Sequence, residues 1–164
     1  MLMKKEINEY LFNAAIKYIG KYPATKKKIN QYLKKELNKK KTYQKANFYE
    51  NFDKENLINS ILTRLDELKI IDESSYLESM FNYYKQSLFS IRKIKNKLYQ
   101  KGFDEKEIDN YISLQLSENP DLEIDILKKY IQKKNLKNLE LSEMKKKLYQ
   151  QSFTENSIYK IIRE

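Results

Sequence analysis

An internal repeat with a period of 50 residues is the feature that most constrains the fold of this chain. The segment IRKIKNKLYQKGFDEKEIDNYI (residues 91–112) aligns without a gap to LSEMKKKLYQQSFTENSIYKII (residues 141–162), and nine of the 22 aligned positions are identical. Self-similarity at a fixed period of roughly 20 to 50 residues is typical of proteins built from stacked units of one kind. The sequence therefore predicts at least two units with the same local structure.

Each copy of the repeat predicts two helices joined by a corner. Before the corner, apolar residues recur at i, i+3 and i+7, which places them on one helical face. These residues are Ile91, Ile94 and Leu98 in the first copy and Leu141, Met144 and Leu148 in the second.

The residues at the corner have the pattern of a helix N-terminus. Asp104 is the expected N-cap, with Glu107 completing a capping box, and Phe103 and Ile108 are placed to form a hydrophobic staple. Thr154, Phe153 and Ile158 occupy the same positions in the second copy. We expect a more divergent corner upstream, with Asp53 as its cap, Phe52 and Leu57 as its staple, and a preceding helix that begins at Thr25 and buries Ile29 and Leu33.

The domain organisation follows from these corners and from the scarcity of turn residues, since the chain has only two Gly and two Pro. One further helix is expected before each corner, with Asp72 as the cap of the second and with Asn119 and Pro120 at the start of the third. The predicted fold is all-α, an elongated curved array of three three-helix units resembling tandem helix-turn-helix repeats. The units span residues 1–69, 70–118 and 119–164, and the basic insertion 38–51 is expected to be a mobile loop.

The absence of Cys and His excludes disulfides, thiolate nucleophiles, histidine bases and Cys/His zinc sites. The acidic residues Asp72, Glu73, Asp104 and Glu107 are expected at separate helix starts, where they act as caps rather than as a catalytic or metal-binding group. We therefore predict no enzyme activity, no catalytic residue, no cofactor and no metal. The sequence begins without the apolar stretch of a signal peptide and has no run long enough to span a bilayer, so a cytoplasmic protein without membrane contact is expected.

The net charge of +10 has two explanations. It fits an anionic partner such as nucleic acid or an acidic protein surface, or it reflects an A/T-rich coding sequence that favours Lys. Residues 1–52 contain 13 Lys and four acids (+9), residues 53–120 contain ten cations and 12 acids (−2), and residues 121–164 contain ten cations and seven acids (+3). This uneven distribution favours an anionic partner.

The central stretch IIDESSYLESMFNYYKQSLFSIRKIKNKLYQKGFDEKEID resembles the RecX family of recombinase regulators. The family pattern has an acidic pair, an aromatic residue and a basic helix that ends in Leu, two residues, Lys, Gly and an apolar residue. The matching residues are Asp72, Glu73, Tyr76, Ile94, Leu98, Lys101, Gly102 and Phe103, and in the first unit Thr25, Ile29 and Leu33. The sequence departs from the pattern at Lys97, where the family usually has Glu, and at Leu88, where Gly is common.

The resemblance implies a protein without chemistry of its own that lies in the groove of a RecA–DNA filament and limits filament growth, ATP hydrolysis and strand exchange. A monomer is expected. The alternative is a sequence-nonspecific binder of single- or double-stranded DNA, and a helical scaffold for another protein is a third hypothesis. The partner-binding candidates are the cations of three equivalent helices: Lys26, Lys27, Lys28, Lys34 and Lys35; Arg92, Lys93, Lys95, Lys97 and Lys101; and Lys145, Lys146 and Lys147. A solvated helix face is the competing explanation for each group.

Overall fold

The computed structural model describes residues 2–43 and 53–163, and every regular element in these ranges is a helix. The all-α prediction is therefore confirmed. The chain divides into two compact units, Met1–Tyr76 and Leu77–Glu164. The division into three units at residues 69 and 118 stays a prediction. None of the helices in the described ranges has both the length and the apolar character needed to cross a bilayer.

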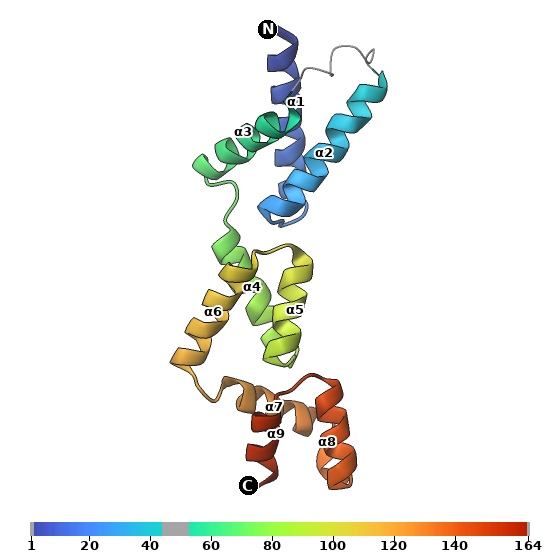
Figure 1. Ribbon diagram of the computed structural model, residues 1–164, viewed down its shortest axis with the longest axis vertical. Coiled ribbons are helices and arrows are strands. Elements are labelled where there is room, and N and C mark those ends of the chain that lie inside the picture. Colours follow the sequence, from blue (N-terminus) through green and yellow to red (C-terminus); the bar gives the residue numbers. More distant parts are fainter. Residues whose placement is uncertain (1, 44–52, 164) are drawn as a thin grey trace. The chain divides into compact units, whose positions relative to one another are not determined.

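The first unit contains α1 (Leu2–Ile19), α2 (Lys26–Tyr43) and α3 (Lys54–Glu67), which are shown in Figure 1. All three helices contribute to one core, in which Leu11, Leu33 and Ile58 are completely buried. The rings of Tyr18 and Tyr32 stack at the edge of this core, with their centroids 4.3 Å apart. As expected, Thr25 caps α2, because its hydroxyl oxygen accepts the N–H of Lys28.

The expected loop at residues 38–51 is partly wrong, because α2 continues to Tyr43. Residues 38–43 contain neither Pro nor Gly, and Lys is a good helix former. The preceding turn is also anchored by Leu37, which is buried in the core. The remaining residues of the predicted loop, 44–51, and the predicted staple residue Phe52 lie outside the described residues.

The second unit begins within α4 (Glu73–Gln86) and continues through α5 (Ile91–Lys101) and α6 (Glu105–Glu118). It then contains α7 (Leu122–Lys133), the short 3-10 helix η2 (Leu136–Asn138), α8 (Leu141–Gln150) and α9 (Glu155–Ile162). The predicted start of α7 at Asn119 and Pro120 is wrong by two residues. Asn119 closes a turn instead, since its carbonyl accepts the N–H of Leu122.

The corner between α5 and α6 forms as the repeat predicts. The carboxylate of Asp104 accepts the N–H groups of Lys106 at 2.9 Å and Glu107 at 3.4 Å. Phe103 and Ile108 are both buried, as the staple requires. In this part of the chain the carboxylate of Glu107 does not return a bond to the Asp104 backbone, so only one half of the predicted capping box is present.

The equivalent corner between α8 and α9 has a cap at the same position of the repeat, and a buried carboxylate lies beside it. Thr154 accepts the N–H of Ser157 at 3.3 Å, and Phe153 and Ile158 are buried. Glu123, in the first turn of α7, accepts hydrogen bonds from the hydroxyls of Thr154 and Ser157 through one oxygen. These hydrogen bonds join α7 to α9 in addition to apolar packing. They lie at a buried position, since Glu123 is 7% exposed.

Both corners have a left-handed residue directly before the buried Phe. Gly102 has φ 99° and Ser152 has φ 64°, and the two positions are 50 residues apart. Leu88, which departs from the glycine common in the RecX pattern, also has a positive φ of 60°. A side chain in this region crowds the following carbonyl oxygen, at a cost of about 1–2 kcal/mol. The repeat thus preserves a backbone conformation even where it does not preserve the glycine.

The acidic pair of the RecX pattern caps two different helices. Asp72 accepts the backbone N–H of Ser75 at 2.9 Å at the start of α4, and this hydrogen bond lowers the pKa of the Asp72 carboxyl. Glu73 accepts the backbone N–H of Lys26 at 2.6 Å, at the first residue of α2. The pair therefore satisfies helix N-termini that would otherwise lack acceptors.

The burial of Phe103 gives a direct test of the corner. Phe103→Ala should lower the free energy of unfolding by roughly 3–5 kcal/mol, because a buried aromatic ring is replaced by a cavity. Tyr99→Ala is the control, since Tyr99 is 55% exposed. Urea unfolding measures both variants. Unchanged hydrogen-exchange protection of residues 91–112 in Phe103→Ala would contradict the corner.

Substitutions at Gly102 and Ser152 test whether the left-handed backbone costs free energy at both corners. Ser152→Gly should raise the free energy of unfolding by about 0.5–1 kcal/mol, because relief of the left-handed strain exceeds the added flexibility of glycine. Gly102→Ala should lower it by about 1 kcal/mol or more. Thermal unfolding of both variants measures these shifts, and two shifts of the same sign would contradict the equivalence of the corners.

Candidate functional site

The cations predicted to bind a partner lie on α2, α5 and α8, and the structure separates them by what their side chains contact. Lys93 on α5 has a structural role: its ammonium donates to Gln151 Oε1 at 2.9 Å and lies 4.6 Å from the centroid of the Phe89 ring. Ser90, the cap of α5, donates its hydroxyl to the Gln151 carbonyl at 2.8 Å. These contacts join the start of α5 to the end of α8.

Lys95 also contacts the protein rather than a partner. Its ammonium lies 2.6 Å from Asp109 and 3.7 Å from Glu105, both on α6. The hydrogen bond to Asp109 is the main cause that raises the pKa of Lys95. Because two carboxylates already neutralise this cation, Lys95 is a weaker candidate for binding an anionic partner than its neighbours on α5.

The cations of α2 show a similar division. The ammonium of Lys26 lies 3.0 Å from Asp66, and that of Lys34 lies 3.5 Å from Glu55, both on α3. Lys28 is half-buried, whereas Lys27 and Lys35 are exposed. Both ion pairs are at the surface, where such pairs contribute only about 0–1 kcal/mol to stability. A stronger anion can therefore displace these carboxylates.

On α8, two of the three predicted cations have contacts within the second unit. Lys145 lies 5.0 Å from the centroid of the Tyr159 ring, and Lys147 lies 3.5 Å from Glu143 one turn earlier. Lys146 is exposed. The equivalent positions of the repeat, 95 and 145, thus contact different groups, because α6 has Asp109 at the position where α9 has Tyr159.

A hollow of about 570 Å³ brings two predicted cations together with aromatic side chains that the sequence did not single out as a site. Lys97 and Lys101 line it from α5, and Tyr83 and Phe89 line it from α4 and the segment after α4. Tyr83 is 60% exposed. The sequence places Tyr83 next to Tyr84, which is buried. Two adjacent tyrosines do not by themselves indicate which ring is exposed, so Tyr83 could not be identified from the sequence.

The carboxylates of the described residues lie mainly at helix starts and in ion pairs. In residues 2–43 and 53–163 no three of them converge in a way that could hold a metal ion. The arrangement offers cations, exposed aromatic rings such as Tyr99 and Tyr149, and hollows between helices. Cations and exposed aromatic rings are groups that can contact phosphates, carboxylates or bases.

The contacts of Lys93 distinguish a structural cation from an exposed one on the same helix. Lys93→Ala should lower the free energy of unfolding by roughly 1–2 kcal/mol, through loss of the hydrogen bond to Gln151 and of the contact with Phe89. Arg92→Ala, which removes an exposed charge one residue away, should stay within about 0.5 kcal/mol. Urea unfolding of both variants tests this difference, and equal effects would show that Lys93 has no structural role.

No family model matches the sequence, and no curated protein does either. Solved structures do match. The crystal structure of RecX from Lactobacillus salivarius superposes with a TM-score of 0.72 over 97% of this chain and 96% of that chain, at 18% identity. A second crystal structure, of a regulatory protein RecX, superposes with a TM-score of 0.71 over 99% of this chain and 75% of that chain, at 19% identity. The chain therefore has the fold of the RecX proteins, as its sequence resemblance implied.

Proposed function

We propose that this protein regulates RecA recombinase, mainly as an inhibitor that binds in the groove of the RecA–DNA filament and limits filament growth, ATP hydrolysis and strand exchange. The observation that supports the proposal most directly is the likeness to RecX structures over nearly the whole chain. The acidic pair, the basic helix α5 and the corner at Gly102 and Phe103 are RecX-like in sequence as well.

The electrostatics of the helices support a filament rather than an isolated protein as the partner. After the internally paired cations are set aside, exposed positive charge remains on each of three helices, at Lys35, Arg92 and Lys146 among others. Each such contact is weak alone. Several weak contacts to neighbouring protomers, held at a fixed spacing by the filament, act together and can raise the overall affinity by roughly 10² to 10⁴.

Sequence-nonspecific nucleic-acid binding is the second candidate, and the hollow between α4 and α5 favours it. Lys97 and Lys101 can neutralise phosphates, and the exposed ring of Tyr83 can stack on a base, a contact that contributes about 1–3 kcal/mol for a single strand. This function predicts affinity for bare DNA that falls by about 10³ or more between 50 and 200 mM salt if six or more phosphates are contacted.

A titration of RecA filaments formed on single-stranded DNA tests the proposal. ATP hydrolysis should fall when the protein is substoichiometric to RecA, because one bound regulator that blocks extension affects many protomers. The same protein is titrated against DNA alone and RecA alone, and both should bind much more weakly. Equal affinity for bare DNA and filament, without an effect on hydrolysis, would overturn the RecA proposal in favour of the nucleic-acid binder.

Charge variants in the full chain test the predicted surface better than truncation. Removing residues after Glu118 also removes Gln151, which bonds to Ser90 and Lys93. Instead, Arg92, Lys97 and Lys101 are changed together to Gln, and the concentration for half-inhibition should rise about tenfold, since three contacts of roughly 0.5 kcal/mol each are lost. Changing Lys129, Lys133 and Lys134 to Gln removes the same charge and is the control, which should leave inhibition within about twofold.

A further inference from the structure

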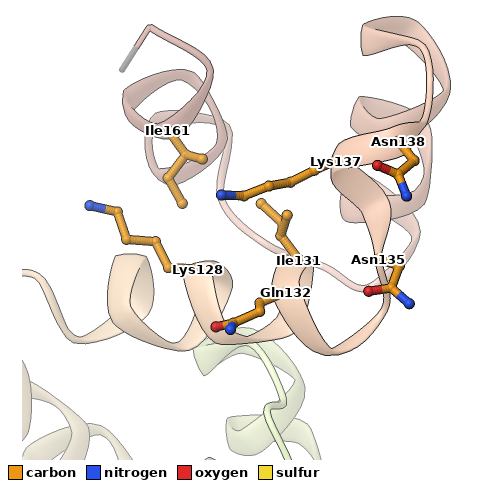
Figure 2. Close-up of a pocket in the computed structure, with 7 residues that line it drawn as sticks. All are labelled: Lys128, Ile131, Gln132, Asn135, Lys137, Asn138 and Ile161. Carbon is orange, nitrogen blue, oxygen red and sulfur yellow. The ribbon is translucent and has the colours of Figure 1, made fainter.

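A second hollow, with a volume of about 690 Å³, lies among α7, η2 and α9 and contains none of the cations predicted from the sequence. Figure 2 shows the side chains that line it. Its volume is within the range of about 300–1,000 Å³ that is usual for ligand sites. It is too large for a single inorganic anion, and its lining indicates what kind of ligand fits.

Two lysine ammonium groups border the hollow, one from α7 and one from η2. Lys128 extends from α7, and Lys137 extends from η2 across Ile131 (Figure 2). Both residues are exposed. The two lysines are brought to the same space because Asn135 has a left-handed backbone, with φ 51°, and turns the chain from α7 into η2. The buried side chain of Leu136 anchors this turn. The arrangement favours a ligand with more than one negative charge.

The other side chains of the lining favour a peptide. Gln132, Asn135 and Asn138 have carboxamides, which donate and accept hydrogen bonds and so match the N–H and C=O groups of a peptide backbone. Ile161 on α9 is half-buried and provides the accessible apolar surface of the hollow, whereas Ile131 is buried, at 3% exposure. A peptide is the polymer that combines backbone amides, carboxylates and an apolar side chain within a few residues.

The same lining argues against a nucleic acid in this hollow. No aromatic side chain is among its lining residues in the described part of the chain, and single strands bind mainly by stacking of bases on aromatic rings together with cation contacts. The hollow between α4 and α5 has such rings and this one does not. We propose that the hollow among α7, η2 and α9 binds an acidic peptide segment of a partner protein, with an apolar side chain of that segment packed on Ile161. The site uses residues other than those proposed to contact RecA–DNA filaments, and it stands whether or not RecA is the partner.

Fluorescence anisotropy with the full chain tests this site. The probe is a fluorescein-labelled peptide of sequence Asp-Glu-Leu-Glu-Asp, and the comparison peptide has Ser in place of Leu. At one fixed ionic strength the Leu peptide should bind with a lower dissociation constant than the Ser peptide. Lys128→Gln combined with Lys137→Gln should raise the dissociation constant of the Leu peptide at least about tenfold. Inorganic phosphate at an equal ionic strength should compete no better than chloride.

The matched control is Lys129→Gln combined with Lys133→Gln, which removes the same charge from exposed positions of α7 outside the hollow. This variant should leave the dissociation constant within about twofold. Circular dichroism verifies that both double variants retain their helix content. Equal losses in the two double variants, equal binding of the Leu and Ser peptides, competition by phosphate, or no binding up to about 1 mM peptide would each overturn the proposal.

Discussion

The second unit depends on burial of the apolar residue that precedes a helix N-cap. Phe103 and Phe153 are each buried just after the end of one helix. The next residue, Asp104 or Thr154, caps the following helix. In both corners the N–H of the Phe bonds back to the carbonyl of a buried leucine, Leu98 or Leu148. One side chain therefore fixes the end of one helix and the start of the next, and the direction of the chain follows from it.

The polar groups buried beside these corners explain why the cations of the repeat are not equivalent. Ser90 and Lys93 bond to Gln151, and Glu123 bonds to Thr154 and Ser157. A buried polar group without a partner is costly, and these bonds satisfy the Ser90 hydroxyl and one oxygen of Glu123, while Glu123 Oε1 is buried without a hydrogen-bond partner among the described residues. Lys93 bonds to Gln151 and Lys95 forms surface ion pairs with two acids of α6. Exposed cations such as Arg92 and Lys146 are left as candidates for contact with a partner.

The two hollows of the second unit differ in chemistry although both are lined by lysines. Lys97 and Lys101 lie beside aromatic rings, whereas Lys128 and Lys137 lie beside carboxamides and Ile131. Charge alone attracts any polyanion, and the neighbouring side chains decide which polyanion is retained. Regulation of an assembly of protein and DNA, as proposed, would use both kinds of surface.

The sequence by itself determined the helical class, the two corners at Phe103 and Phe153, and the caps at Thr25, Asp53, Asp72, Asp104 and Thr154. These features depend on residues within a few positions of one another, so a local pattern is enough to find them. The tertiary structure decided which cations are paired, the bonds between Glu123 and the hydroxyls of Thr154 and Ser157, and both hollows. These features join residues that are distant in sequence. Lys93 bonds to Gln151, and Glu123 bonds to Thr154. Ile161 and Lys128 line one hollow. The helical pattern predicts which face of a helix is apolar, but the packing of other helices decides what each polar side chain on its border contacts.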